Sequence, residues 1–218
     1  MTPKRPPRRI LGIALMLGAL AAVTLLASPA SAFPKGDPVY KFSYKVSATT
    51  YIKKANLTMS PPPGVFKGGI DLSTGQLQGS ISLPNTTFTQ SEAGVGLVTA
   101  TAAIVQTKAV TGHVNIGNFK VTATSTFNIH IVSMYAAKPK LPVPVSVPVP
   151  PVNLVGNSCT TASPVSVTMS GKADLGAPST FKGLFTIPNF MNCGAMTAVI
   201  NQEIPGPGNT FSATAKPS

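Results

Sequence analysis

Residues 119–135 alternate between apolar and polar side chains, and no other pattern in this chain limits its fold so strongly. Side chains of a β-strand point to opposite faces, so the alternation is typical of a strand between a core and water. The apolar positions are Phe119, Val121, Ala123, Phe127, Ile129 and Ile131. The polar positions are Lys120, Thr122, Thr124, Thr126, Asn128 and His130. The pattern predicts one long amphipathic strand.

The same period of two recurs in further segments, which Gly, Pro and Asn residues separate. These segments are 40–53, 76–83, 96–106, 165–170, 181–187 and 210–215. Such strands predict an all-β fold, either an antiparallel β-sandwich or a flattened β-barrel. Residues 195–204 differ, because their apolar side chains recur every three or four positions and predict one short helix near the C-terminus. The apolar set of that helix is Met196, Val199, Ile200 and Ile204.

The first 32 residues have the three parts of a secretion signal. A basic stretch at 4–9 precedes an apolar run at 10–26, and Ala30-Ser31-Ala32 forms a small-residue cleavage site. The alternative is a membrane anchor, since the apolar run is near the lower limit for crossing a bilayer. Pro29 favours cleavage, because it breaks a helix just before that site. We expect 1–32 to be a cleaved signal peptide by the general or the twin-arginine route, and the protein to be extracytoplasmic, in the cell envelope.

The remaining residues, 33–218, are expected to form a single β domain. A proline-rich stretch at 139–151 could be a linker, but the piece after it would be small for an independent domain. We therefore expect this stretch to cross the domain surface as polyproline II.

The chemistry available to that domain is narrow. Four of the 17 Lys and Arg residues lie in the signal, namely Lys4, Arg5, Arg8 and Arg9, which leaves 13 lysines and no arginine beside 5 acidic residues and 2 histidines. His113 and His130 could meet across a hairpin, but no third metal ligand accompanies them. Ser179 and Lys182 fit the S-x-x-K pattern of penicillin-interacting enzymes, but the companion motifs are absent. We expect a non-enzymatic protein with no metal and no other cofactor.

The lysines are the one charged feature that suggests a partner. Lys41, Lys45 and Lys53 have the same parity in one predicted strand and could form a basic stripe that contacts an anionic envelope polymer or lipid headgroups. A solvated strand edge, protected against pairing with other chains, is the alternative. Nucleic acid is not expected, because lysine lacks the planar fork of arginine and no aromatic residues alternate with these charges.

Cys159 and Cys193 are the two cysteines of the chain. In an exported protein they are expected to form a disulfide that closes a loop of about 35 residues and stabilises the fold by about 3.8 kcal/mol. A reactive thiol is the alternative, but neither Cys has a His or Arg near it in sequence.

Three segments near the C-terminus carry a resemblance to a known family. They are Cys159-Thr160-Thr161-Ala162-Ser163-Pro164-Val165, Ile187-Pro188-Asn189-Phe190-Met191-Asn192-Cys193-Gly194 and Pro205-Gly206-Pro207-Gly208-Asn209-Thr210. The chain resembles a family of secreted, functionally uncharacterised actinobacterial β-proteins. The resemblance implies a cell-envelope location and agrees with the cysteine pairing, and it implies no activity and no site residues.

The expected function is binding. One form is a lipid held in an apolar interior, for which the candidate residues are Phe119, Val121, Phe127, Ile129, Phe181 and Phe185. The other is an anionic polymer on the lysine-bearing face. A structural or adhesive surface protein and a hydrolase that uses Ser, His113 or His130 are the rival hypotheses. An internal cavity would favour the lipid form.

Overall fold

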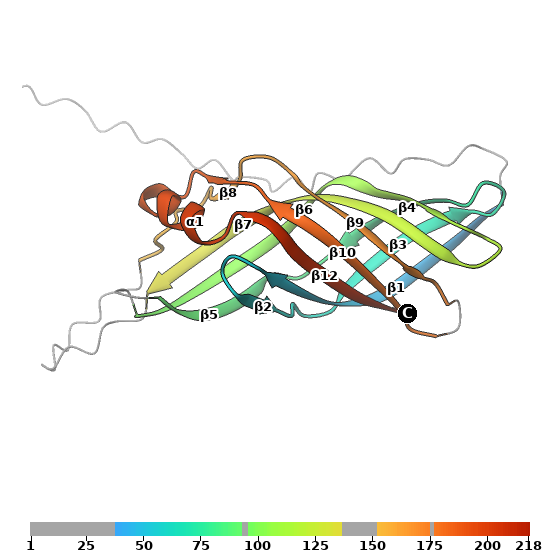
Figure 1. Ribbon diagram of the computed structural model, residues 1–218, viewed down its shortest axis with the longest axis horizontal. Helices are drawn as coiled ribbons and strands as arrows, with labels where there is room; N and C mark the ends of the chain where they lie inside the picture. Colours follow the sequence, from blue (N-terminus) through green and yellow to red (C-terminus); the bar gives the residue numbers. More distant parts are fainter. Residues whose placement is uncertain (1–37, 93–95, 137–151, 175–176) are drawn as a thin grey trace, which may run out of the picture.

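The computed structural model describes residues 38–92, 96–136, 152–174 and 177–218, which form an elongated β-barrel (Figure 1). The expected signal peptide, 1–32, and the proline-rich stretch, 139–151, lie outside these ranges. The strands are β1 (Val39–Ile52), β2 (Leu57–Met59), β3 (Gly64–Asp71), β4 (Gln76–Ser82), β5 (Thr86–Glu92), β6 (Gly96–Val114), β7 (Lys120–Ala136), β8 (Thr160–Thr161), β9 (Val165–Lys172), β10 (Ser179–Ile187), β11 (Phe190–Met191) and β12 (Gly206–Pro217).

Antiparallel pairing runs through the order β7-β9-β10-β12-β1-β3-β4-β6, and a further pairing of β6 with β7 closes the ring. The predicted all-β class is therefore confirmed, and the choice between sandwich and barrel is settled as a closed barrel. Closure leaves these eight strands without a free edge over most of their length.

Short strands extend the wall where a long strand is interrupted. β2 pairs with the last residues of β1, beyond the point where β3 leaves it. Pro61, Pro62 and Pro63 separate β2 from β3, since proline has no N–H for a sheet ladder. In the same way, β5 replaces β4 as the partner of β6.

We call one end of the barrel the hairpin end. It holds the turn 72–75 between β3 and β4, the turn 115–119 between β6 and β7, the start of β1 and the end of β12. The first turn is closed by the Asp71 carboxylate, which accepts hydrogen bonds from the amides and hydroxyls of Ser73 and Thr74. The second is held by Asn115, whose side-chain oxygen accepts from the amide of Gly117.

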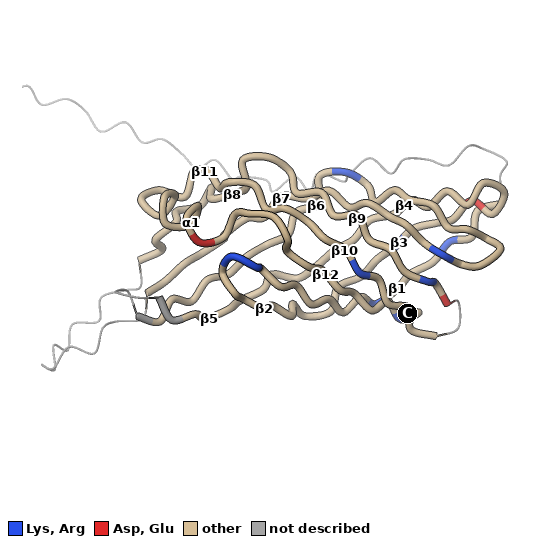
Figure 2. The backbone as a smooth tube through the Cα atoms, in the orientation of Figure 1, with Lys and Arg blue, Asp and Glu red and all other residues tan. Residues whose placement is uncertain are grey.

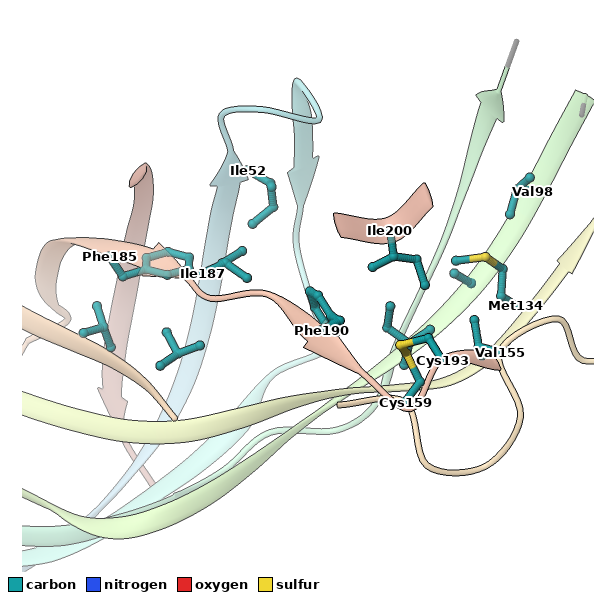
Figure 3. Packing of buried hydrophobic residues seen from close by; sticks show 14 residues of the cluster. Ile52, Val98, Met134, Val155, Cys159, Phe185, Ile187, Phe190, Cys193 and Ile200 are labelled. Atoms are coloured by element: carbon teal, nitrogen blue, oxygen red, sulfur yellow. A yellow bond between two sulfur atoms is a disulfide. The ribbon is translucent and has the colours of Figure 1, made fainter. Parts of the chain in front are cut away.

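We call the other end the capped end. A 3-10 turn (η1, Gly194–Met196) and the helix α1 (Thr197–Glu203) cover it, together with β8 and β11. Ile200 of α1 is buried in the largest hydrophobic cluster, and Figure 3 shows it beside the disulfide of Cys159 and Cys193. The predicted short helix is confirmed, but Val199, expected on its apolar face, is 50% exposed.

The structure corrects several details of the strand predictions. Phe119 precedes β7 and is exposed, with a left-handed φ of 57°, because it closes the tight turn that begins at Asn115. β6 continues eight residues beyond its predicted end at 106, to Val114. Some short or glycine-containing strands were not predicted, namely β2, β3, β5, β8 and β11.

Candidate functional site

The inner face of the barrel carries many small side chains. Val46 and Ala48 of β1 face inward and lie opposite Ala215 and Ala213 of β12. Ala123 of β7 is a further inward alanine. A barrel of eight strands has an interior that side chains can fill, or that can hold one small ligand. Alanines at these positions leave space that larger residues would occupy.

Three cavities follow one another inside the barrel. The largest, of about 80 Å³, lies in the half toward the capped end and is lined by Ile52, Phe127, Ile129, Phe185 and residues of the surrounding strands. The next has about 70 Å³, and the third, toward the hairpin end, has about 60 Å³. Each exceeds several-fold the roughly 10–15 Å³ that one water molecule requires.

Neighbouring cavities share part of their walls. The first and second are both lined by Ile81, Ser125, Met169 and Phe211. The second and third are both lined by Phe66, Leu77, Val121, Phe181 and Ala215. The empty space therefore follows the length of the barrel as a series, with a mainly apolar wall. Of the six interior residues that the sequence indicated, all except Phe119 line these cavities.

Ser125 is the polar exception at the middle of this series. It lies between Ala123 and Phe127 on the inward face of β7, is 4% exposed, and lines both the first and the second cavity. Its hydroxyl is a hydrogen-bonding group on a wall that is otherwise mainly apolar, and a ligand in either cavity could use it. Ser125 was not among the predicted interior residues, although it interrupts the apolar parity of its strand.

A second polar group lies near the hairpin end. Tyr44 lines the third cavity, and its ring centroid is 5.3 Å from that of Phe42. Burial raises the pKa of Tyr44, and the nearby Tyr40 and Asp174 raise it further. Its phenol therefore stays neutral near neutral pH and can donate a hydrogen bond to a ligand atom at that end of the cavity.

The capped end closes one side of the interior. The cluster there includes Val155, Phe190 and Ile200, each at most 3% exposed. Cys159 and Cys193 lie in the same cluster as the predicted disulfide, with Cα atoms 4.2 Å apart. These residues fill the space between the strand ends at the capped end.

The three lysines singled out in the sequence do not form one stripe. Lys41 and Lys45 are exposed on the outer face of β1, near the hairpin end. Lys53 follows β1 in the turn toward β2, and its backbone amide donates to Asn209 at 3.0 Å. The structure therefore separates Lys53 from the other two, because the strand ends before reaching it.

The candidates for catalysis and metal binding are not assembled into a site. His113 lies opposite Thr122 in the sheet and His130 opposite Ala103, so the two histidines do not face each other. The Ser179 hydroxyl is engaged with the backbone of Asp174. Within the described ranges, no group of three or more His, Cys, Asp or Glu residues could hold a metal ion.

No helix in the described part of the chain is long and apolar enough to cross a membrane. The features that remain are the cavity series and the distribution of lysines on the outer wall. No protein family, curated protein or solved structure matches this chain.

Proposed function

We propose that this protein is a non-enzymatic extracytoplasmic carrier that holds a slender apolar ligand, such as the acyl chain of a lipid, inside its barrel. The observation that carries the proposal is the series of three apolar cavities with shared walls along the barrel. A narrow, extended space suits a chain-like ligand better than a bulky ring system.

The energetics favour such a ligand. Apolar cavities stay dry, and burial of each methylene of an acyl chain contributes about 0.8 kcal/mol. Among the residues that the structure describes, no Lys, Asp, Glu or His lines any of the three cavities, so the ligand portion inside the barrel is expected to be uncharged. Ser125 and Tyr44 supply the few polar contacts that fix a ligand's position.

The extracytoplasmic location rests on two features of the chain. One is the secretion signal in the sequence, and the other is the Cys159–Cys193 disulfide, since such bonds persist in oxidising compartments. The structural or adhesive role and the hydrolase are less favoured, because neither uses the unfilled interior. Binding of an anionic partner by lysines concerns the outer wall and not the cavities.

The proposal is tested by filling the largest cavity. Ala48→Phe places a ring on the inner face of β1, whereas Ser47→Phe places the same ring on the outer face of the same strand. The probe is N-phenylnaphthylamine, a neutral apolar dye that fluoresces in dry surroundings and is not attracted by lysines.

The unaltered protein and Ser47→Phe are expected to bind the dye equally, and Ala48→Phe at least tenfold more weakly. Thermal unfolding followed by circular dichroism checks that both variants are folded. Equal dye binding by all three folded proteins, or no binding by the unaltered protein, would overturn the proposal.

A further inference from the structure

Lysines gather on the outer wall toward the hairpin end. We call this group the lysine belt. Its members come from six strands that are neighbours in the sheet, in the order β3, β1, β12, β10, β9 and β7. Its members are Lys67, Lys41, Lys45, Lys216, Lys182, Lys172 and Lys120, all exposed. Figure 2 shows most of the basic segments in the half of the barrel that carries the C-terminus, away from α1.

The register of the sheet brings belt lysines directly opposite one another. Lys45 pairs with Lys216 across β1 and β12, and Lys120 pairs with Lys172 across β7 and β9. Like charges directly opposite on one face of a sheet destabilise it. The belt therefore does not stabilise the barrel, and its positive charge is available for an anionic partner.

Exposed apolar side chains lie in turns at the same end of the barrel as the belt. Leu72 in the turn between β3 and β4 is 48% exposed, and Ile116 in the turn between β6 and β7 is 41% exposed. Tyr40 is also exposed, near the start of β1. Exposed apolar groups on loop tips, flanked by Lys67 of β3 and Lys120 of β7, match an interface in which the tips enter lipid and the lysines meet headgroups.

Phe119 adds an independent sign of function at the same place. It is exposed while its φ of 57° is in the left-handed region, which a bulky residue adopts only at a cost. Hydrogen bonds from its amide to Asn115 and from the Ala173 amide to its carbonyl hold this conformation. The turn therefore holds an aromatic residue in a backbone conformation that Asn or Gly would adopt at a lower cost in free energy.

We propose that the hairpin end docks on an anionic lipid bilayer, with Leu72, Ile116 and Phe119 entering the interface and the lysine belt contacting the headgroups. This inference goes beyond the carrier function and does not rest on the cavities. An anionic polymer would satisfy the lysines but would leave the apolar tips in water, so the bilayer accounts for more of the surface.

The capped end lacks this combination. Apolar side chains are exposed there as well, among them Leu97, Met191 and Val199. The described lysines outside the belt are Lys53 and Lys54, in the turn after β1, and Lys108 on β6. The capped end therefore offers matched controls, in which the same kinds of side chain are changed away from the proposed interface.

The test is sedimentation of the purified protein with vesicles of phosphatidylcholine alone or mixed with phosphatidylglycerol. Binding is expected to the mixed vesicles only. Lys120→Gln with Lys172→Gln should weaken it about 25-fold, since each lysine near an anionic surface contributes about fivefold. Lys53→Gln with Lys54→Gln should leave it unchanged. Loss of the lysine pair removes a repulsion, so unfolding does not explain a loss of binding.

The aromatic tip distinguishes a bilayer from a polymer. Phe119→Asn should keep the turn, because Asn adopts left-handed backbone readily, and should weaken binding to mixed vesicles about tenfold. Val199→Asn is the control on α1. Failure to bind mixed vesicles would overturn the proposal. So would vesicle binding that is insensitive to Phe119, which would instead favour an anionic polymer. Ala48→Phe, which fills the cavity, should bind vesicles normally, so this inference and the carrier proposal can fail separately.

Discussion

The two ends of the barrel are held together in different ways. At the capped end, hydrogen bonds join parts of the chain that are far apart: Asn209 accepts from Lys53, 156 positions away, and the disulfide joins residues 34 positions apart. At the hairpin end, the side-chain bonds of the turn residues Asp71 and Asn115 reach only two or three residues along the chain. The distant links at that end join backbone groups, as from the Ala173 amide to the Phe119 carbonyl, or exposed hydroxyls.

This difference gives the two ends separate roles. The capped end contributes stability, and the hairpin end carries the exposed groups that we propose for recognition. Long-range links close large loops, so loss of one at the capped end frees segments that the barrel needs. Local turns hold their own shape and leave neighbouring positions free for exposed groups such as Leu72 and Ile116. The hairpin end can therefore carry opposed lysines and a strained Phe119, because the capped end supplies the stability that these features reduce.

Removal of the disulfide should have the largest effect. The double variant Cys159→Ser, Cys193→Ser is expected to lose about 3.8 kcal/mol of unfolding free energy by the loop-entropy argument, which corresponds to a fall in Tm of about 8–15 °C. Urea and thermal unfolding would measure it, with the unaltered protein in reductant as an independent comparison. A loss below about 1 kcal/mol would show that the capped end does not depend on its covalent link.

The asparagines of the two ends allow a matched comparison. Asn209 is 1% exposed, accepts from Lys53, and donates to the carbonyls of Gly206 at 2.8 Å and Phe185 at 3.4 Å. Asn209→Ala leaves buried groups unpaired and should cost about 2–3 kcal/mol. Asn115→Ala affects an exposed turn, where water replaces the lost bonds, and should cost less than about 1 kcal/mol. Urea unfolding of both variants measures the difference, and equal losses would contradict the division between the ends.

Strands whose alternation is regular, such as β7 and β1, were predictable from the sequence. β3 was not, because Gly64, Gly68 and Gly69 remove the pattern. Gly68 is needed there for packing, because a Cβ atom would lie 2.3 Å from the Gln78 carbonyl oxygen and 3.0 Å from the Phe42 ring. Such a requirement arises from the neighbouring strands, so a single segment does not reveal it.

The candidate site was only partly predictable for a related reason. Alternation identifies an inward apolar face, but whether that face is filled or hollow depends on which strands lie opposite. The pairing of Ala48 with Ala213, and of β6 with β7, is set by the closed ring. Phe119 had the right parity for the core, yet the turn after Gly117 and Asn118 places it outside. The disulfide was predictable, because the chain has two cysteines and its first 32 residues have the pattern of a secretion signal.

The smallest effect should be a response to acid confined to the hairpin end. Hydrogen bonds from Ser73 and then Thr74 lower the pKa of Asp71 from 3.8 to about 2, although burial opposes the shift. A carboxyl with a lowered pKa in the folded state contributes stability above its unfolded pKa and loses it as pH falls toward the folded value. The contribution of Asp71 should therefore be complete above about pH 5 and largely lost by about pH 2.

Hydrogen exchange can locate this loss. The amides of Ser73 and Thr74 donate to Asp71, whereas the amide of Phe190 at the capped end donates to the uncharged side chain of Asn201. Protection of the first two should fall between about pH 5 and pH 2 while that of Phe190 stays constant. Asp71→Asn, which has no charge to lose, should remove the pH dependence at Ser73 and Thr74. Equal loss of protection at both ends would mean that acid opens the barrel as a whole, and the ends would then not be independent in stability.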